Sequence, residues 1–240
     1  MALIRTRDEQ LGDGQHAVDA YVVEPADGEI RAGILFLHWL GHIRSNRTQF
    51  LREARDYARL GIRCVLPAGR FPWEPDPADA DTDVANLELE QGRLDRALDR
   101  LSDGLPNGTP LALVGHDFGA MHGLRLAARR TAFAAAVVIA ATPRWGDWFL
   151  RFWEVKDDRF EYLRRLEQFD PVTVAGAIDS PILWQFSERD FFIAPMSAIE
   201  LARAAPGDPR IEWYAADHAM RSAKARAARL AFLREQLRLG

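Results

Sequence analysis

The most informative segment of this chain reads Leu113-Val114-Gly115-His116-Asp117-Phe118-Gly119-Ala120. It joins an apolar run at 111–115 to a helical pattern at 118–129, so a buried strand runs directly into a helix. Glycines on either side of Asp117 predict a sharp turn, because strand and helix come so close there that side chains would clash. The turn presents Asp117 at the N-terminus of the helix, where the helix dipole favours an anion. We therefore take Asp117 as a candidate nucleophile.

A second interpretation of Asp117 is that it only caps the following helix, a role that aspartate fills well. A cap needs neither flanking glycines nor an apolar strand in front of it, and both are present here. The nucleophile interpretation gains weight if an acid and a histidine follow in the chain order that such a site requires.

Candidate partners do follow Asp117, each directly after a predicted strand. Asp190 and Glu188 lie just beyond the apolar run at 182–186, and His218 lies between the last predicted strand and the final helix. In this order the chain resembles the α/β-hydrolase superfamily, and the resemblance covers essentially the whole chain. It implies a catalytic triad of Asp117, Asp190 and His218, with Glu188 as the fallback for the acid.

Strands and helices alternate along the rest of the chain. This alternation predicts an α/β fold with a mostly parallel central sheet and helices on both faces, as the α/β-hydrolase resemblance also implies. Strands are expected at 2–7, 18–23, 32–38, 62–66, 111–115, 133–140, 182–186 and 211–214, and helices at 45–60, 84–101, 118–129 and the C-terminus. We expect one domain over residues 1–240. Residues 143–180 form a small aromatic-rich cap insertion within it, because that segment is too long for an ordinary connection.

The resemblance also implies an oxyanion hole made of backbone N–H groups. One group would come from Trp39 or Leu40, in the loop after the predicted strand at 32–38. The other would come from Phe118, directly after the nucleophile. These donors would hold the charge that develops on an oxygen of Asp117 itself.

An aspartate nucleophile points to a particular reaction. The reference pKa of an aspartate side chain is about 3.9, so its carboxylate is ionised at neutral pH and attacks without a base. Its natural target is an sp³ carbon that bears a leaving group, which gives an alkyl ester on the enzyme. His218, oriented by Asp190, would then activate the water that hydrolyses this ester.

Two groups of relatives share features with the chain. The segment Gly-His-Asp-Phe-Gly at 115–119 resembles that of haloalkane dehalogenases and epoxide hydrolases, which implies cleavage of a carbon–halogen bond or an epoxide. The compact size and the segment at 169–181 resemble the dienelactone hydrolase family, but that family has a cysteine nucleophile and a glutamate at the position of Trp39. An esterase or lactonase of that type is therefore one alternative. A catalytically silent fold that binds a small ligand is another, although it would need neither an acid nor a histidine.

Several side chains are candidates for substrate binding, each with a simpler explanation. Trp39 could offer its indole N–H to a halide, and Arg70 could pair with a substrate carboxylate, although a loop arginine is more often solvated. Trp145 and Trp148 follow a helical spacing that is typical of packing, but a cap over the nucleophile would turn one or two rings to the substrate. Tyr162 is a candidate acid for an epoxide, although epoxide hydrolases of this superfamily usually use two cap tyrosines.

The other histidines and the cysteine have plain explanations. His116 is expected to pack beside the nucleophile. His42 and His122 could line the site, but neither has a partner at metal-binding spacing. Cys64 lies within an apolar run, which favours an inert core thiol.

Composition narrows the functional classes. The formal net charge of −4 comes from interspersed charges of both signs without a basic block, which argues against nucleic-acid and membrane partners. The sequence has no uncharged stretch of eighteen residues and no apolar N-terminal signal. The single cysteine excludes a disulfide within the chain. We expect a cytoplasmic enzyme with a small-molecule substrate and with no metal or cofactor, and a homodimer is compatible with such a fold.

Overall fold

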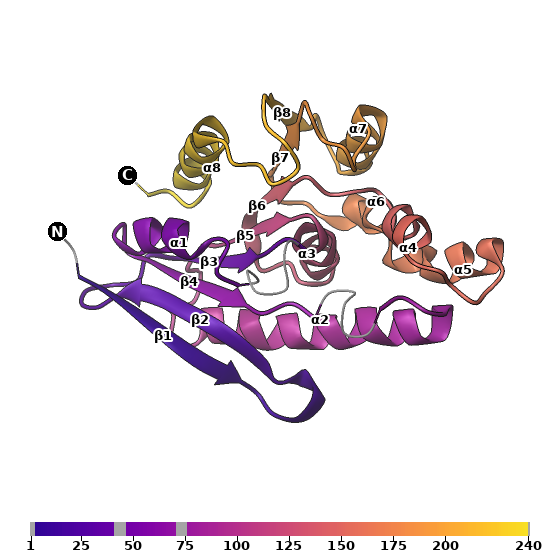
Figure 1. The fold of residues 1–240 in the computed structure, drawn as a ribbon. Coiled ribbons are helices and arrows are strands. Elements are labelled where there is room, and N and C mark those ends of the chain that lie inside the picture. The colour runs from indigo at the N-terminus through magenta and orange to yellow at the C-terminus, as the bar shows by residue number, and fades with distance from the viewer. Residues whose placement is uncertain (1–2, 41–46, 71–75, 240) are drawn as a thin grey trace.

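A mixed β-sheet forms the centre of the computed structural model, which describes residues 3–40, 47–70 and 76–239. Its eight strands follow the order β1-β2-β4-β3-β5-β6-β7-β8. Strand β2 runs antiparallel to both of its neighbours, β1 and β4, and the other pairings between the described strands are parallel. The strands are β1 (Ile4–Leu11), β2 (Val18–Pro25), β3 (Ala32–Leu37), β4 (Ile62–Pro67), β5 (Leu111–His116), β6 (Phe133–Ile139), β7 (Ile182–Ser187) and β8 (Arg210–Tyr214). The mostly parallel sheet that the sequence predicts is confirmed (Figure 1).

The central strands are buried along their whole length. Every residue of β3, β4, β5 and β7 is buried, as expected for strands that helices cover on both faces. In the register of the sheet, Gly115 at the end of β5 pairs with Leu37 on β3 and with Val138 on β6. The loops that follow these parallel strands therefore emerge together at the carboxyl edge of the sheet, where ligands bind in open α/β folds.

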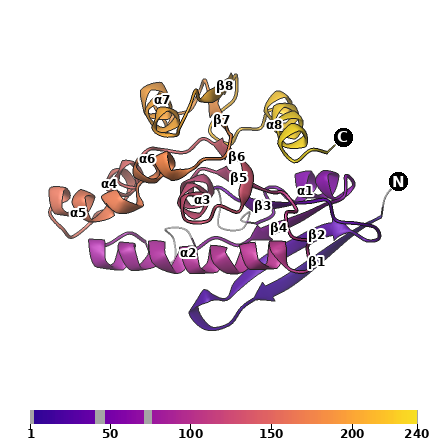
Figure 2. The same ribbon diagram turned by 180° about the vertical axis from the view of Figure 1, so that it is seen from behind.

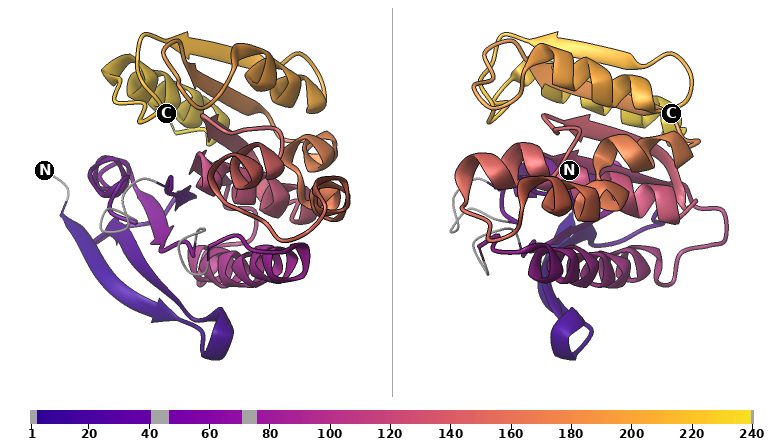
Figure 3. Two further views of the ribbon diagram at one scale, coloured as in Figure 1. Left: turned by 45° about the vertical axis from the view of Figure 1, so that its right-hand side comes forward. Right: turned by 90° about the vertical axis from the view of Figure 1, so that its right-hand side faces the viewer.

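Helices cover both faces of the sheet. One face carries α1 (Leu51–Ala58) and α8 (Ala223–Gln236), and the opposite face carries α2 (Ala80–Ser102), α3 (Phe118–Arg129) and α7 (Pro195–Ala204) (Figures 1 and 3). The view from behind shows the long helix α2 beside α3 (Figure 2). None of the described helices combines the length and the apolar character that crossing a bilayer requires.

Short helices fill the connection between β6 and β7. They are α4 (Gly146–Phe152), α5 (Arg159–Leu166), η2 (Glu167–Phe169), α6 (Pro171–Val174) and η3 (Ala175–Ala177). In this connection α5 packs against α2, and α6 packs against α3. The expectation of a single domain with a cap at 143–180 stays a prediction, but the described helices show which elements that segment contains.

Three helices differ from the sequence-based expectation. The helix expected at 45–60 is the shorter α1, which begins at Leu51 after a turn. The helix expected at 84–101 begins earlier, at Ala80, because the side chain of Asp79 accepts the Thr82 N–H and caps it. Helix α7, which begins at Pro195, was not expected at all. A further short helix, η1 (Gly14–His16), forms in the turn between β1 and β2.

Candidate active site

The turn between β5 and α3 places Asp117 in an unusual backbone conformation. Its φ is 54° and its ψ is −121°, a region that residues with a side chain rarely adopt. A Cβ atom on Gly115 would lie 2.5 Å from the Cα of Ala120, and one on Gly119 would lie 2.3 Å from the carbonyl oxygen of His38. Both flanking glycines are therefore required by close backbone contact, as the sequence predicted.

Asp117 does not act as a helix cap. Its side chain accepts no hydrogen bond from the N–H groups of the first turn of α3, so the capping interpretation is wrong. The carboxylate is 1% exposed. Burial of a carboxylate without capping bonds indicates that other groups compensate its charge.

Two groups face the two carboxylate oxygens of Asp117. The N–H of Leu40 donates a hydrogen bond of 3.0 Å to Oδ2. Nε2 of His218 lies 3.7 Å from Oδ1, which is too long for a hydrogen bond but close enough for an ion pair. Oδ1 and this Nε2 have no hydrogen-bond partner among the described residues. The carboxylate thus has one oxygen held by the backbone and one oxygen left open beside an imidazole.

Asp190, the expected acid, lies in the loop after β7 and contacts His218. Nδ1 of His218 donates a hydrogen bond of 2.9 Å to Oδ2 of Asp190. The other oxygen of Asp190 accepts the N–H groups of Phe192 and Ile193 at 2.9 and 3.1 Å. Glu188 is exposed, and its backbone N–H donates to the carbonyl of Tyr214 in β8. The structure therefore brings Asp190 to the histidine and leaves the fallback acid at the surface.

His218 lies between two carboxylates in a buried position. Burial by itself lowers the pKa of His218, but its interactions with Asp117 and Asp190 raise this pKa to about 9. The imidazole is accordingly protonated at neutral pH. The site in its resting form holds an imidazolium ion between two acids.

Rings surround the imidazole of His218. Phe192, Trp148 and Trp39 lie with their centroids 5.0, 5.7 and 6.0 Å from its own. Trp148 belongs to α4, and Phe192 to the loop of Asp190. The side chain of Arg151 joins these two elements by donating a hydrogen bond of 3.2 Å to the carbonyl of Phe192. These rings place apolar surface around the imidazole.

The oxyanion-hole prediction can be refined for one of its two groups. The N–H of Trp39 donates to Oε1 of Gln49 at 2.8 Å, so Leu40 is the residue whose N–H reaches Asp117. Phe118 is the first residue of α3, and its ring packs against Trp148. Its role as the second N–H donor stays a prediction.

The substrate-binding candidates separate into two groups. Trp39 and Trp148 contact the ring of His218, and the indole Nε1 of Trp148 is buried without a hydrogen-bond partner among the described residues. Arg70 has an exposed side chain, and its backbone N–H donates to Glu90. The structure does not bring the Arg70 guanidinium to the triad.

Trp145 and Tyr162 are packing residues rather than substrate-facing ones. The indole N–H of Trp145 donates to the carbonyl of Phe169, and its ring is 1% exposed. The hydroxyl of Tyr162 is also buried and donates a hydrogen bond of 2.7 Å to Asp83 on α2. Because that hydrogen bond uses its proton, Tyr162 is not available as an acid for an epoxide, and this expectation is corrected.

Sequence reasoning missed Gln49, Phe192 and the contacts of His116. Nothing in the sequence marks Gln49, since glutamines in loops are common and rarely catalytic. Phe192 carried a weak signal because it lies two residues after Asp190, in a loop that the sequence already placed at the site. His116 was expected to pack, and it is buried, but both of its ring nitrogens are also hydrogen bonded.

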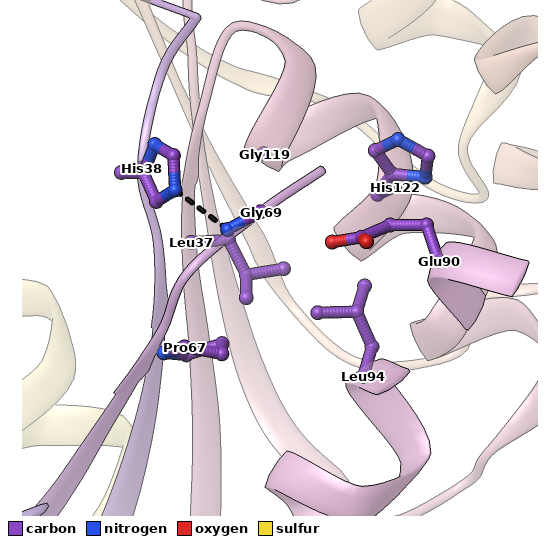
Figure 4. Close-up of a pocket in the computed structure, with 8 residues that line it drawn as sticks. All are labelled: Leu37, His38, Pro67, Gly69, Glu90, Leu94, Gly119 and His122. Carbon is purple, nitrogen blue, oxygen red and sulfur yellow. Dashed lines mark hydrogen bonds between the residues drawn. The ribbon is translucent and has the colours of Figure 1, made fainter. Parts of the chain in front are cut away.

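Figure 4 shows a small cavity beside Gly119. It is lined by Leu37, His38, Pro67, Gly69, Glu90, Leu94, Gly119 and His122, and it offers ≈ 10 Å³ to the centre of a water molecule. This is about the room that one water needs. Burial raises the pKa of Glu90 to about 7 and lowers that of His122 to about 3. Because no triad residue lines the cavity, we assign it a structural role.

The remaining candidates behave as buried core groups. Cys64 is fully buried, which raises the pKa of its thiol well above the usual value and disfavours the reactive thiolate. His42 lies outside the described residues. Among residues 3–40, 47–70 and 76–239, no cluster of histidine, cysteine and acidic side chains is arranged to hold a metal ion.

Comparison with known proteins shows the fold of the chain. No family model and no curated protein matches the sequence. The esterase domain of a Rhodothermus marinus protein superposes with a TM-score of 0.67 at 17% identity, covering 97% of this chain and 99% of that one. A proposed dienelactone hydrolase from Klebsiella pneumoniae gives 0.69 at 16%, covering 98% and 99%. The acylaminoacyl peptidase of Pyrococcus horikoshii gives 0.75 at 13%, covering 97% of this chain and 42% of that one. The chain therefore has the α/β-hydrolase fold.

Proposed function

We propose that this chain is a hydrolase that attacks an sp³ carbon of a small apolar substrate with Asp117. The resulting alkyl ester is hydrolysed by water that His218 activates. The single observation that carries the proposal is that the two oxygens of the Asp117 carboxylate have different surroundings. Oδ2 accepts the N–H of Leu40 at 3.0 Å, whereas Oδ1 has no hydrogen-bond partner among the described residues and faces His218 at 3.7 Å.

In the first step, Oδ1 of Asp117 attacks the substrate carbon. A carbon–oxygen bond forms, and the bond to the leaving group breaks with its electron pair going to that group. An in-line displacement places the leaving group on the side of the carbon opposite Oδ1. The buried indole N–H of Trp148 on α4, which has no hydrogen-bond partner among the described residues, is the candidate donor to a departing anion.

In the second step, His218 changes from an acid to a base. Once Asp117 is an ester, it no longer carries the negative charge that helps to hold the pKa of His218 at about 9, so this pKa falls. The imidazole releases its proton to solvent and then takes one from a water molecule. The hydroxide attacks Cγ of Asp117, and the N–H of Leu40 stabilises the charge that develops on Oδ2. The intermediate collapses as the bond from Cγ to the alkoxide oxygen breaks and His218 returns its proton to that alkoxide. Asp117 is then a carboxylic acid, and transfer of its proton to the neutral His218 restores the carboxylate and the imidazolium.

The geometry favours a good leaving group, such as a halide, over an epoxide. Opening of an epoxide places an alkoxide on the side opposite the nucleophile, where a proton donor is needed. Tyr162, the tyrosine considered for this role, donates a hydrogen bond to Asp83. A halide requires only a hydrogen-bond donor and a poorly hydrated pocket, both of which the rings beside His218 are suited to supply.

An esterase or lactonase of the dienelactone hydrolase type is the second candidate. The names of two structural neighbours, an esterase domain and a proposed dienelactone hydrolase, favour it. Against it stands the chemistry of Asp117, because attack of a carboxylate on an ester carbonyl forms a reactive anhydride and expels a poor alkoxide. A silent ligand-binding fold is disfavoured, since it would have no use for the hydrogen-bonded pair of Asp190 and His218.

Isotope labelling distinguishes these candidates. A single turnover is run in ¹⁸O water with haloalkanes, haloacids, epoxides and aryl esters, and the peptide that contains Asp117 is weighed. We expect one labelled oxygen in that peptide and none in the peptide that contains Asp190, which serves as the internal control. Turnover that leaves the Asp117 peptide unlabelled would indicate direct acyl hydrolysis, and an absence of turnover with every substrate would favour the silent fold.

A further inference from the structure

A hydrogen-bond chain crosses the site behind the triad. The N–H of Trp39 donates to Oε1 of Gln49 at 2.8 Å, and Nε2 of Gln49 donates to Nδ1 of His116 at 2.6 Å. Nε2 of His116 in turn bonds the backbone carbonyl of His218 at 2.9 Å. These three hydrogen bonds link the loop after β3 to the loop after β8.

The chemistry of the partners fixes the protonation of His116. A carbonyl oxygen only accepts, so Nε2 must carry the proton that is donated to His218. An amide nitrogen only donates, so Nδ1 must be the acceptor for Gln49. Burial lowers the pKa of His116 well below its usual value, and the charge of His218 acts in the same direction. His116 is therefore a neutral Nε2–H tautomer.

This series of hydrogen bonds connects the groups that must surround Asp117. His116 immediately precedes the nucleophile, and its ring stacks on Trp39 with centroids 5.3 Å apart and planes at 10°. Trp39 immediately precedes Leu40, whose N–H holds Oδ2 of Asp117. Fixing the N–H of Trp39 on Gln49 leaves the next N–H directed at the nucleophile.

We propose that Gln49 and His116 are positioning residues that set the distance between the oxyanion-binding N–H of Leu40 and the imidazole of His218. The proposal rests on the proposed function only for its catalytic effect, because the tautomer and the bonds are properties of the resting protein. Holding His218 by its backbone carbonyl leaves its ring free to gain and lose a proton without moving the loop. His116, expected to be a packing residue, thereby becomes a structural link between two parts of the site.

The first test concerns the resting protein and needs no substrate. Long-range ¹H–¹⁵N spectra of the full chain report the tautomer and titration of each histidine ring. We expect a ring with the neutral Nε2–H pattern that does not titrate between about pH 5 and about pH 9, and His116→Phe must remove this signal. An Nδ1–H tautomer, or a titrating His116, would contradict the proposed series of hydrogen bonds.

The second test measures the positioning effect on catalysis. Gln49→Met keeps the length of the side chain but removes both hydrogen bonds. We expect kcat to fall by roughly 10- to 100-fold while KM changes by less than about threefold, because the groups shift relative to one another without a loss of substrate contacts. Gln49→Glu should recover only part of kcat, because its carboxylate keeps the acceptor for the Trp39 N–H but offers no donor to Nδ1 of the neutral His116.

A matched variant controls for the exchange of glutamine for methionine. Gln168→Met, at an exposed position in η2, should leave kcat and KM unchanged. An unchanged kcat in Gln49→Met would overturn the positioning role. If no substrate were turned over by the unmodified protein, the proposed function would fail. The tautomer of His116 would still decide whether the hydrogen bonds between Trp39, Gln49, His116 and His218 exist.

Discussion

At the scale of the residue, the proposed nucleophile Asp117 has a backbone conformation that is unfavourable for a residue with a side chain. With φ at 54° and ψ at −121°, Asp117 lies where glycine is strongly preferred. The cost is compensated by the packing of β5 and α3 around the turn, since both neighbouring glycines leave no room for another arrangement. Strain of this kind is typical of sites where a side chain must be presented at a fixed angle.

This strain predicts an unusual order of stability among variants of Asp117. Asp117→Gly should be more stable than Asp117→Ala by on the order of 1–3 kcal/mol, because both lose the carboxylate but only glycine relieves the backbone. Urea unfolding of the two variants measures the difference. Asp208 is exposed and outside the positive-φ region, so its glycine and alanine variants should differ in free energy of unfolding by only about a few tenths of a kcal/mol. Equal stability of the two Asp117 variants would show that the turn is not strained.

The charge of His218 predicts a pH dependence of stability. Its pKa is about 9 in the folded protein, against an ordinary value of 6.5. Because the folded pKa is the higher one, the folded state binds the proton more tightly. The stabilisation is therefore complete below about pH 6.5 and is lost as the pH rises through about 9.

The comparison with His218→Gln isolates this effect from other titrating groups. The free energy of unfolding of the wild type, minus that of the variant, should fall by at most about 3 kcal/mol between pH 6 and pH 9.5, since one pKa unit corresponds to about 1.4 kcal/mol. Urea titrations at several pH values give this difference. A difference that stays constant with pH, or grows as the pH rises, would contradict the raised pKa.

At the scale of the element, the contact between α3 and β3 sets the geometry of the site. A Cβ on Gly119 would lie 2.3 Å from the carbonyl oxygen of His38 and 2.5 Å from that of Leu37. These are backbone atoms of β3 and of the loop that leads to Leu40. The helix therefore approaches the strand as closely as two backbones allow, and this approach brings Leu40 to Asp117.

Replacement of Gly119 tests that contact. Gly119→Ala should destabilise the protein by roughly 3 kcal/mol, because the methyl group forces α3 away from β3. It should also lower activity by moving the Leu40 N–H. Thermal unfolding and turnover measure the two effects. The control is Gly176→Ala, where the nearest atom lies 3.5 Å from the new Cβ, and there a change within about 0.5 kcal/mol is expected. Similar losses in both variants would refute the contact argument.

Elements with a strong local signal could be predicted from the sequence. Helix α3 has the expected bounds, and the buried strands lie within a few residues of expectation, because apolar runs bounded by turn residues are a local property. Helix α7 was missed. It begins with Pro195 and has small and mixed side chains, so its helical state depends more on packing than on its own pattern.

The site was predicted as far as chain order carries information. Asp117, Asp190 and His218 each follow a strand, and the parallel sheet brings those loops together. The tertiary contacts could not be predicted. Whether Trp39 or Leu40 donates to Asp117 depends on Gln49, and whether Tyr162 is free depends on Asp83, a residue far away in the sequence.

At the scale of the whole molecule, a buried ion pair ties the last helix to the first. Arg229 on α8 donates to both oxygens of Glu53 on α1, at 3.1 and 2.8 Å, and to Gln185 on β7 at 2.9 Å. Its side chain is 6% exposed and that of Glu53 is 9% exposed. Both helices lie on the same face of the sheet (Figure 1). Because α8 begins shortly after His218, this pair also anchors the loop that carries the histidine.

Removal of one member of this pair should cost more than removal of both. Arg229→Met leaves the Glu53 carboxylate buried without its bidentate partner, and we expect a loss of roughly 3 kcal/mol. This is at the low end for such a pair because Arg226 lies 4.0 Å from the same carboxylate. The double variant Arg229→Met with Glu53→Leu should regain about half of that loss, since it removes the unpaired charge as well.

A double-mutant cycle tests this expectation, with urea unfolding of Arg229→Met, Glu53→Leu and the double variant. The exposed pair of Arg164 and Glu161 is the control, and Arg164→Met should change stability by less than about 0.5 kcal/mol. If Arg229→Met were no more harmful than Arg164→Met, the buried pair would contribute little to the position of α8. The loop of His218 would then owe little to this pair and more to the hydrogen bonds from His116 and to Asp190.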